Sequence, residues 1–303
     1  MRWWRGRTSI AVSIVVLVAV VGCGCASPTP QVVTPPPEPS TTGPATGAPR
    51  GPDHVVVAIF ENKDFAQIDG NSKAPYLNQL MRNAAVLVNA HAVAHPSQPN
   101  YLALFSGSTQ GIDSDRCFDP LTGRPSLGQQ LISAGRSFIG YSEDLPDVGY
   151  TGCTSGGYAA KHNPWVHFAN LPVTTNLPFA AFPADYASLP TVAFVVPNLC
   201  NDMHDCPVST GDTWAKQHLD AYAQWAKAHN SLLIVTFDEN DGRPDNTILT
   251  VFAGAGVKPG RYGEAADHYR VLRTIENFYG LPPLGNAAQQ SPLTDLFTTA
   301  PAK

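Results

Sequence analysis

The segment His54-Val-Val-Val-Ala-Ile-Phe60 decides the fold class, because it is an unbroken run of apolar and mostly β-branched residues. Such a run is typical of a strand that is buried on both faces, as in parallel sheets covered by helices on each side. Glu61-Asn62 follows directly, so the run ends in polar residues. Residues 54–60 are therefore predicted to form a central strand with polar groups at its carboxyl end.

Similar runs alternate with segments of helical periodicity along the chain. The predicted strands are residues 54–60, 86–93, 137–141, 191–196, 231–237 and 248–252. The predicted helices are residues 74–85, 101–105, 126–134 (with a capping box at Ser126 and Gln129), 212–228 (with Asp212 as N-cap) and 269–279. Residues 143–189 are rich in Gly, Pro, Asn and aromatic residues without a clear period, which indicates a long ordered excursion. This alternation predicts an α/β fold with a mostly parallel sheet sandwiched by helices.

The chain is predicted to have three parts. Residues 1–22 combine three arginines with an apolar stretch too short for an ordinary spanning helix, which is typical of a signal peptide. Residues 23–52 begin at Cys23, whose preceding Val-Val-Gly is similar to a bacterial lipobox, and continue as a proline-rich tether. We expect lipidation at Cys23, with Cys25 as a poorer candidate and plain secretion as the alternative. Residues 53–303 are long enough for one large domain.

Four cysteines remain beyond the lipobox region. Their even number in an exported chain favours two disulfides. Three pairings are possible, and the short spacing favours Cys200–Cys206, which leaves Cys117–Cys153. Zinc ligation is the alternative, but neither the spacing nor the export signal suits it.

The charge of the chain limits its partners. The net charge is −5, and no basic run or alternation of basic and aromatic residues occurs. Nucleic-acid binding by electrostatic attraction is therefore not expected. An acidic protein that handles an anionic substrate needs local positive charge, for which a metal ion is the natural source.

Polar side chains follow four of the predicted strands. They are Glu61-Asn62, His95-Pro-Ser97, Asn201-Asp-Met-His204 with Asp205, and Asp238-Glu239. The preference of Asp, Asn and Ser for turns can explain any one of these groups. Four such groups after buried strands indicate a binding site, because ligands bind beyond the carboxyl ends of parallel strands. Adjacent acids in one pocket would repel each other without a cation. The sequence therefore predicts a divalent metal site.

Several motifs together resemble the bacterial phosphoesterase family. They are Glu61-Asn62, His95-Pro-Ser-Gln-Pro-Asn-Tyr101, Lys161-His-Asn-Pro-Trp165, Asn201-Asp-Met-His-Asp205, Asp238-Glu-Asn-Asp-Gly242 and Asp267-His-Tyr269. This family contains secreted acid phosphatases and phospholipases C and belongs to the alkaline-phosphatase-like superfamily. The chain is most similar to its mycobacterial secreted acid phosphatases, and the motifs span residues 53–297 in order.

The resemblance implies a role for each matched residue. Ser97 matches the nucleophile, Asn100 an amide that contacts a phosphate oxygen, and His204 a proton donor. Lys161 and His162 are expected to contact phosphate. The metal ligands implied are Glu61, Asn62, Ser97, Asp202, His204, Asp238, Glu239 and His268. Glu239 stands where many superfamily members have His, which leaves the identity and number of the metal ions open.

The resemblance implies a metal-dependent acid phosphatase that acts on phosphate monoesters through a phosphoserine, and the N-terminal residues, which lie outside the resemblance, predict that it is exported and lipid-anchored. It would lie outside the cytoplasm and contact the membrane through its lipid anchor. A phospholipase C-type phosphodiesterase is the near alternative, because both reactions use the same nucleophile. A non-catalytic surface lipoprotein is the alternative from a different class.

Overall fold

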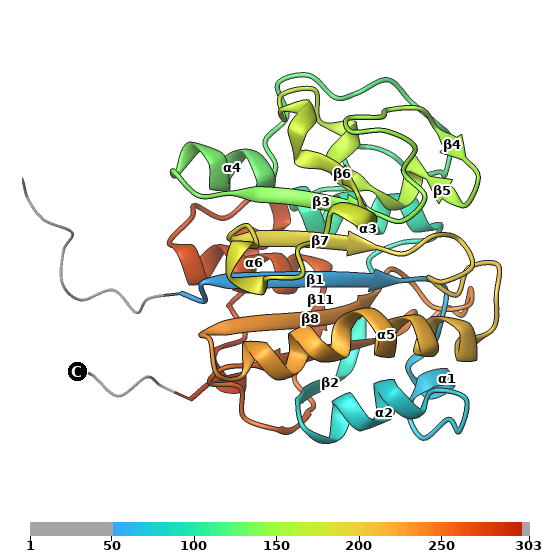
Figure 1. Cartoon of the computed structure of the whole chain (residues 1–303), viewed down its shortest axis with the longest axis vertical. Coiled ribbons are helices and arrows are strands. Elements are labelled where there is room, and N and C mark those ends of the chain that lie inside the picture. The colour runs from blue at the N-terminus through green and yellow to red at the C-terminus, as the bar shows by residue number, and fades with distance from the viewer. Residues whose placement is uncertain (1–50, 299–303) are drawn as a thin grey trace, which may run out of the picture. The chain divides into compact units, whose positions relative to one another are not determined.

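The computed structural model describes residues 51–298, and these fold around one large sheet (Figure 1). Its strand order is β10-β2-β9-β8-β1-β7-β3-β6, with β11 paired to β2. The main strands are β1 (His54–Phe60), β2 (Ala85–His91), β3 (Phe138–Ser142), β6 (Asn176–Pro178), β7 (Val192–Val196), β8 (Ser231–Phe237), β9 (Thr247–Gly254), β10 (Gly260–Tyr262) and β11 (Ala266–Asp267). Strand β9 is antiparallel to both neighbours, and every other pairing in this sheet is parallel.

The central strands confirm the prediction made from their composition. Strand β1 lies between β7 and β8, with Val56 paired to Ala193 on one side and Leu233 on the other. All residues of β7 and β8 are buried, as are all those of β1 except His54. Burial on both faces explains why these strands read as unbroken apolar runs.

Helices cover both faces of the sheet. They are α1 (Phe65–Ile68), α2 (Pro75–Arg82), α3 (Ser97–Ser106), α4 (Leu127–Ser133), α5 (Val208–Ala226) and α6 (His268–Tyr279). Figure 1 shows α5 and α2 in front of the sheet and α6 and α3 behind it. None of the helices among residues 51–298 is long and apolar enough to cross a membrane.

The expected excursion between β3 and β7 contains short elements. They are β4 (Thr154–Ser155), β5 (Tyr158–Ala159) and the 3-10 helices at Ala160–His162, Pro164–His167, Val173–Thr175, Phe179–Ala181 and Tyr186–Ser188. Two further 3-10 helices follow α6, at Gly285–Gln289 and Thr294–Leu296. Strand β6 also belongs to this region and extends the main sheet beside β3, so part of the excursion is sheet rather than cover.

Three predicted helix starts need comment. The helix predicted from residue 101 begins four residues earlier, at Ser97, so that α3 includes both Ser97 and Pro99. Asp212 does not cap α5, which begins four residues earlier; its buried carboxylate instead accepts hydrogen bonds from the backbone N–H groups of Tyr76 and Leu77. Asp212 thus caps α2 from a distance. Ser126 does cap α4, but only its half of the predicted capping box is present.

Both preferred disulfides are present, Cys117–Cys153 and Cys200–Cys206. Zinc ligation by these cysteines is therefore excluded. The signal peptide, the tether and Cys23 lie outside the described residues, except that the tether's last two positions, 51 and 52, are described.

Candidate active site

Five of the predicted site residues meet at one edge of the sheet. Glu61 follows β1, Asp202 follows β7, Asp238 and Glu239 follow β8, and Ser97 begins α3 after β2. The backbone holds these ends together, because the N–H of Glu61 donates to the Asp202 carbonyl at 2.8 Å. All five residues are buried. The rule that ligands bind at the carboxyl ends of parallel strands therefore located this cluster correctly.

The hydroxyl of Ser97 faces two carboxylates. Its Oγ lies 3.0 Å from Glu61 Oε2 and 3.1 Å from Glu239 Oε1, and it is 2% exposed. A hydroxyl has one hydrogen, so it donates to one of these acceptors at a time. Ser97 is also the first residue of a ten-residue helix, whose N-terminus favours negative charge.

Asn100 differs from its expected role. It is fully buried, and its Oδ1 accepts from the N–H groups of Val93 and Ala94, both at 3.0 Å. Its Nδ2 donates to the carbonyls of Ala94 and Pro96. The amide is thus occupied by the loop before Ser97, which leaves no free donor for a phosphate oxygen. In this structure Asn100 positions the loop.

The carboxylates are close enough to perturb one another. Burial, assisted by the charges of Asp238 and Asp202, raises the pKa of Glu61 well above its usual value. Burial and the charge of Glu239 likewise raise the pKa of Asp238 well above its usual value. Burial also raises the pKa of Asp202 to about 7 and raises the pKa of Glu239 above its usual value. Four buried acids cannot all ionise without a compensating cation.

His162 has a different place from the phosphate contact that was expected. It is 1% exposed and lies between two acids, with Nε2 3.2 Å from Glu61 and Nδ1 3.1 Å from Asp202. Its ring stacks on Tyr101, and burial together with the Lys161 charge lowers its pKa well below the usual value. A buried neutral imidazole between carboxylates is suited to metal ligation.

Glu61, His162 and His204 form a candidate metal centre. Each offers a ligand atom, and these atoms lie within 4.8 Å of one another. Two buried atoms nearby, Asp238 Oδ2 and His162 Nε2, have no hydrogen-bond partner within residues 51–298. Such unpartnered polar atoms cost free energy unless something binds them, so the residues present fit a divalent cation.

The other predicted ligands stand around this centre. The side-chain amide of Asn62 donates to Glu61 Oε2, and its backbone N–H donates to Asp238 Oδ1, both at 3.0 Å. His268 is buried at the start of α6, where Nε2 contacts the Asp238 carbonyl at 2.6 Å and Nδ1 has no partner in the part of the chain that the structure describes. His268 is therefore joined to the cluster through the backbone of Asp238.

Lys161 and His204 form the exposed rim of the site. Lys161 Nζ lies 2.8 Å from Asp115 Oδ2 and 3.3 Å from His204 Nε2. His204 Nδ1 contacts Asp205 at 2.7 Å. The Lys161 ammonium at this rim can contact an anion, which the buried carboxylates would repel unless a cation lies between them.

Sequence reasoning did not assign four residues that complete the site. The Tyr101 hydroxyl donates to Glu61 Oε1, and the His95 ring contacts Glu239. Lys63 Nζ donates to the Met203 carbonyl at 2.8 Å. Asp115 is the fourth. Tyr101 and His95 stand inside a recognised motif and so carried a signal, whereas nothing in the sequence marks Asp115.

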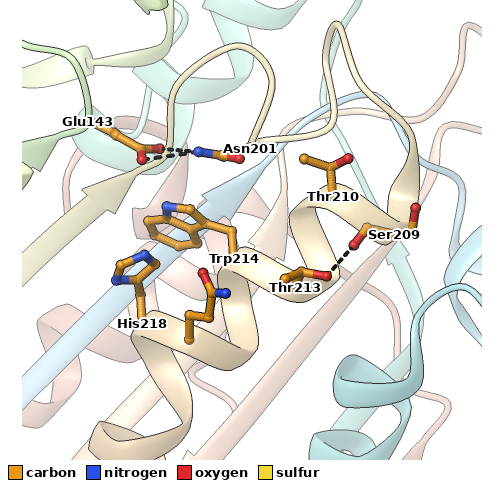
Figure 2. Close-up of a pocket in the computed structure, with 8 residues that line it drawn as sticks. Glu143, Asn201, Ser209, Thr210, Thr213, Trp214 and His218 are labelled. Carbon is orange, nitrogen blue, oxygen red and sulfur yellow. Dashed lines mark hydrogen bonds between the residues drawn. The ribbon is translucent and has the colours of Figure 1, made fainter.

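A separate pocket of about 530 Å³ opens beside the start of α5 (Figure 2). Glu143 and Asn201 form one wall, where the Asn201 amide donates to both carboxylate oxygens. Trp214 lines the opposite side. Asn201 belongs to a polar group predicted from the sequence, but none of the residues assigned a catalytic, phosphate-binding or metal-binding role lines this pocket.

Comparisons with known proteins show the family of the chain. The model of the phosphoesterase family matches residues 70–282. The chain is 52% identical over 248 residues to the phosphatidylinositol-3-phosphatase of Mycobacterium tuberculosis, covering 80% of this chain and 82% of that protein. It is 30% identical over 253 residues to the phosphate-repressible acid phosphatase of Penicillium chrysogenum, covering 77% of this chain and 60% of that protein.

Solved structures show the same fold. A protein of the alkaline phosphatase superfamily from Vibrio parahaemolyticus superposes with a TM-score of 0.56 at 14% identity, covering 83% of this chain and 72% of that chain. This likeness confirms the predicted alkaline-phosphatase-like α/β architecture.

Proposed function

The chain belongs to the phosphoesterase family and is a phosphoric ester hydrolase, and from this premise we propose that it hydrolyses phosphate monoesters with Ser97 as the nucleophile and a divalent metal ion. One observation carries the proposal. The Ser97 hydroxyl lies at the N-terminus of α3 and within hydrogen-bond distance of two carboxylates of a buried acidic cluster. The names of the relatives, which are phosphatases, support the choice of reaction.

The metal would be held by Glu61, Asp202, Asp238, His162 and His204. These residues supply carboxylate and imidazole ligands, which suit zinc and other divalent ions. When bound, the ion supplies positive charge that lowers the pKa of the Ser97 hydroxyl and neutralises phosphate oxygens. The remaining chemistry belongs to the side chains of the chain itself.

The reaction proceeds in two balanced steps. In the first, Ser97 Oγ bonds to phosphorus, the bond to the ester oxygen breaks, and the leaving alcohol takes a proton from solvent water at the rim, since His204 would be held by the metal. The serine proton passes to Glu61 or Glu239, the two acceptors in contact with Oγ. In the second, water attacks the phosphoserine, which releases phosphate and restores the hydroxyl. Lys161 and the N-terminus of α3 stabilise the anionic phosphoryl group in both steps.

Export and anchoring form a further part of the proposal. Two disulfides are typical of a protein folded outside the cytoplasm. The lipobox-like residues before Cys23 and the proline-rich tether support attachment to the membrane by a lipid, with secretion as the alternative. Metabolic labelling with a palmitate analogue, compared between wild type and C23A, tests this; labelling that persists in C23A contradicts Cys23 as the site.

The Ser97→Ala substitution tests the proposed nucleophile. Turnover of p-nitrophenyl phosphate should fall by about 10³-fold or more, because among the described residues only the Ser97 hydroxyl contacts both Glu61 and Glu239. Ser106→Ala is the matched control, since it removes a buried hydroxyl at the other end of α3. Unchanged activity in S97A would refute the mechanism, and inactivity of the wild type would refute the enzymatic proposal.

A comparison of substrates distinguishes monoesters from diesters. The phosphatidylinositol-3-phosphatase similar to this chain makes phosphoinositide monoesters the first natural substrates to test. We expect faster turnover of p-nitrophenyl phosphate than of p-nitrophenylphosphorylcholine. The reverse order would identify the phospholipase C-type alternative.

A further inference from the structure

Asp115 joins two parts of the site that lie far apart in sequence. Its Oδ1 accepts from the backbone N–H of Gln98 at 3.0 Å, and its Oδ2 lies 2.8 Å from Lys161 Nζ. One carboxylate therefore contacts both the residue after Ser97 and the cation at the rim. Asp115 itself is about one third exposed and belongs to none of the motifs.

The first contact fixes the start of α3. This helix has no side-chain cap of its own, because its N-cap is Pro96, and Pro99 lacks an N–H. Asp115 supplies the cap from a distant segment. The Gln98 side chain adds two hydrogen bonds to the same segment, to the carbonyls of Ser114 and Arg116 at 2.7 and 3.0 Å. The helix that carries Ser97 is thus tied to residues 114–116.

The second contact holds Lys161 at the rim. A lysine side chain is long and flexible, and the acidic cluster of Glu61, Asp202 and Asp238 attracts its ammonium group. The Asp115 carboxylate instead keeps Nζ beside His204, at 3.3 Å from Nε2. Lys161 in this position faces an incoming anion and leaves the buried carboxylates free for a metal ion.

The surrounding chain fixes the distance between the two partners. Cys117, two residues after Asp115, forms a disulfide with Cys153. The Cys153 carbonyl in turn accepts a hydrogen bond from the N–H of Ala160, the residue before Lys161, at 2.9 Å. The segments of Asp115 and Lys161 are therefore linked covalently and by hydrogen bonds close to the pair itself.

From these contacts we propose that Asp115 is a positioning residue for the phosphate-binding side of the site, acting through Lys161. This inference rests on the proposed function. Asp115 orients the Lys161 ammonium group, which contacts the phosphoryl oxygens. It also fixes the start of α3, the helix that carries Ser97.

The test uses Asp115→Asn and Lys161→Met with inorganic phosphate as the probe. Asparagine retains an oxygen that can accept from the Gln98 N–H but loses the charge that holds Lys161. We expect D115N to weaken phosphate binding, measured by calorimetry, by about tenfold, as is typical of a lost charge-assisted hydrogen bond. The KM for p-nitrophenyl phosphate should rise by a similar factor while kcat changes less. Asp113→Asn is the matched control, because Asp113 is exposed in the same segment.

The double variant decides whether Asp115 acts through Lys161. If it does, D115N combined with K161M binds phosphate no worse than K161M alone. Multiplied effects would overturn the proposal, as would a D115N variant that behaves like D113N. The wild type could lack phosphatase activity and still bind phosphate, with binding weakened in D115N. That result would refute the proposed function but would leave the positioning role of Asp115 standing.

Discussion

Tyr101 connects the helix of the nucleophile to the end of β1, because its buried hydroxyl donates to Glu61. A residue that orients a metal ligand affects metal affinity although it does not touch the metal. We predict that Tyr101→Phe lowers the affinity for the activating divalent ion by about tenfold. Titration of the metal-stripped protein with metal, followed by activity and by melting temperature, measures this shift.

Tyr158→Phe is the control for this prediction. The Tyr158 hydroxyl is also buried, but it has no hydrogen-bond partner among the described residues. Its removal should leave metal affinity unchanged. Equal affinities of Y101F and Y158F would show that the Tyr101 hydroxyl does not support Glu61.

Individual site residues could be predicted where they stand next to a strand end or inside a motif. Glu61, Ser97 and Asp238 satisfy both conditions, and the structure brings them together. The roles of Asn100 and His162 could not be predicted, because both are polar residues whose burial and partners depend on the folded loops. From the sequence, the Asn100 amide could be expected to face a substrate. In the structure it is hydrogen-bonded to the backbone that precedes Ser97.

At the level of elements, the sequence predicted strands better than helix starts. A buried central strand needs a continuous apolar run, so β1, β7 and β8 were recognisable. Asp212 was misassigned because an Asp that caps a neighbouring helix across space has the same local sequence as one that caps its own. The start of α3 lies four residues before the predicted residue 101, because proline is tolerated in the first turn of a helix and Pro99 therefore does not prevent the helix from beginning at Ser97.

Glu276, a buried acid in the last turn of α6, makes stability depend on pH. Glu276 Oε1 accepts from the N–H of Leu284 at 2.8 Å, while Oε2 has no partner among the residues that the structure describes. Burial raises the pKa of Glu276 to about 7, against the opposing effects of the Leu284 N–H and Arg273. The folded state therefore binds this proton more tightly than the unfolded state, whose carboxyl titrates near 4.5. The stability linked to the proton is present below pH 4.5 and is lost as the pH rises through 7.

We predict that Glu276→Gln removes this loss, because glutamine keeps an acceptor for Leu284 and does not ionise. The variant should match the wild type near pH 4.5 and exceed its free energy of unfolding by about 2 kcal/mol at pH 8. Denaturant unfolding at both pH values measures the difference. Asp295→Asn, at an exposed carboxyl, is the control. A difference between E276Q and wild type that is the same at both pH values would contradict the prediction.

At the level of the whole molecule, the site has a part that follows from sheet topology and a part that does not. Parallel strands deliver Glu61, Asp202 and Asp238 to one edge, and this could be predicted from the sequence. Asp115 and Lys161 come from segments without a period, which are positioned by a disulfide and short 3-10 helices. Their approach depends on long-range contacts, for which a single sequence carries little signal.

The buried acids lead to a final prediction, which concerns the stability of the whole domain. Without a cation, Glu61, Asp202, Asp238 and Glu239 are held together against their mutual repulsion, and burial raises the pKa of each. A metal that binds only the folded state stabilises it by about 2.7 kcal/mol at a concentration a hundred times its dissociation constant.

Protein stripped by a chelator should therefore melt at a lower temperature and recover when Zn²⁺, Mn²⁺, Mg²⁺ or Ca²⁺ is titrated back, with the largest shift identifying the preferred ion. Glu61→Gln should abolish this recovery, whereas Glu264→Gln, which removes only a surface ion pair with Arg270, should preserve it. Identical melting temperatures with and without every one of these ions would show that the acidic cluster is not a metal site.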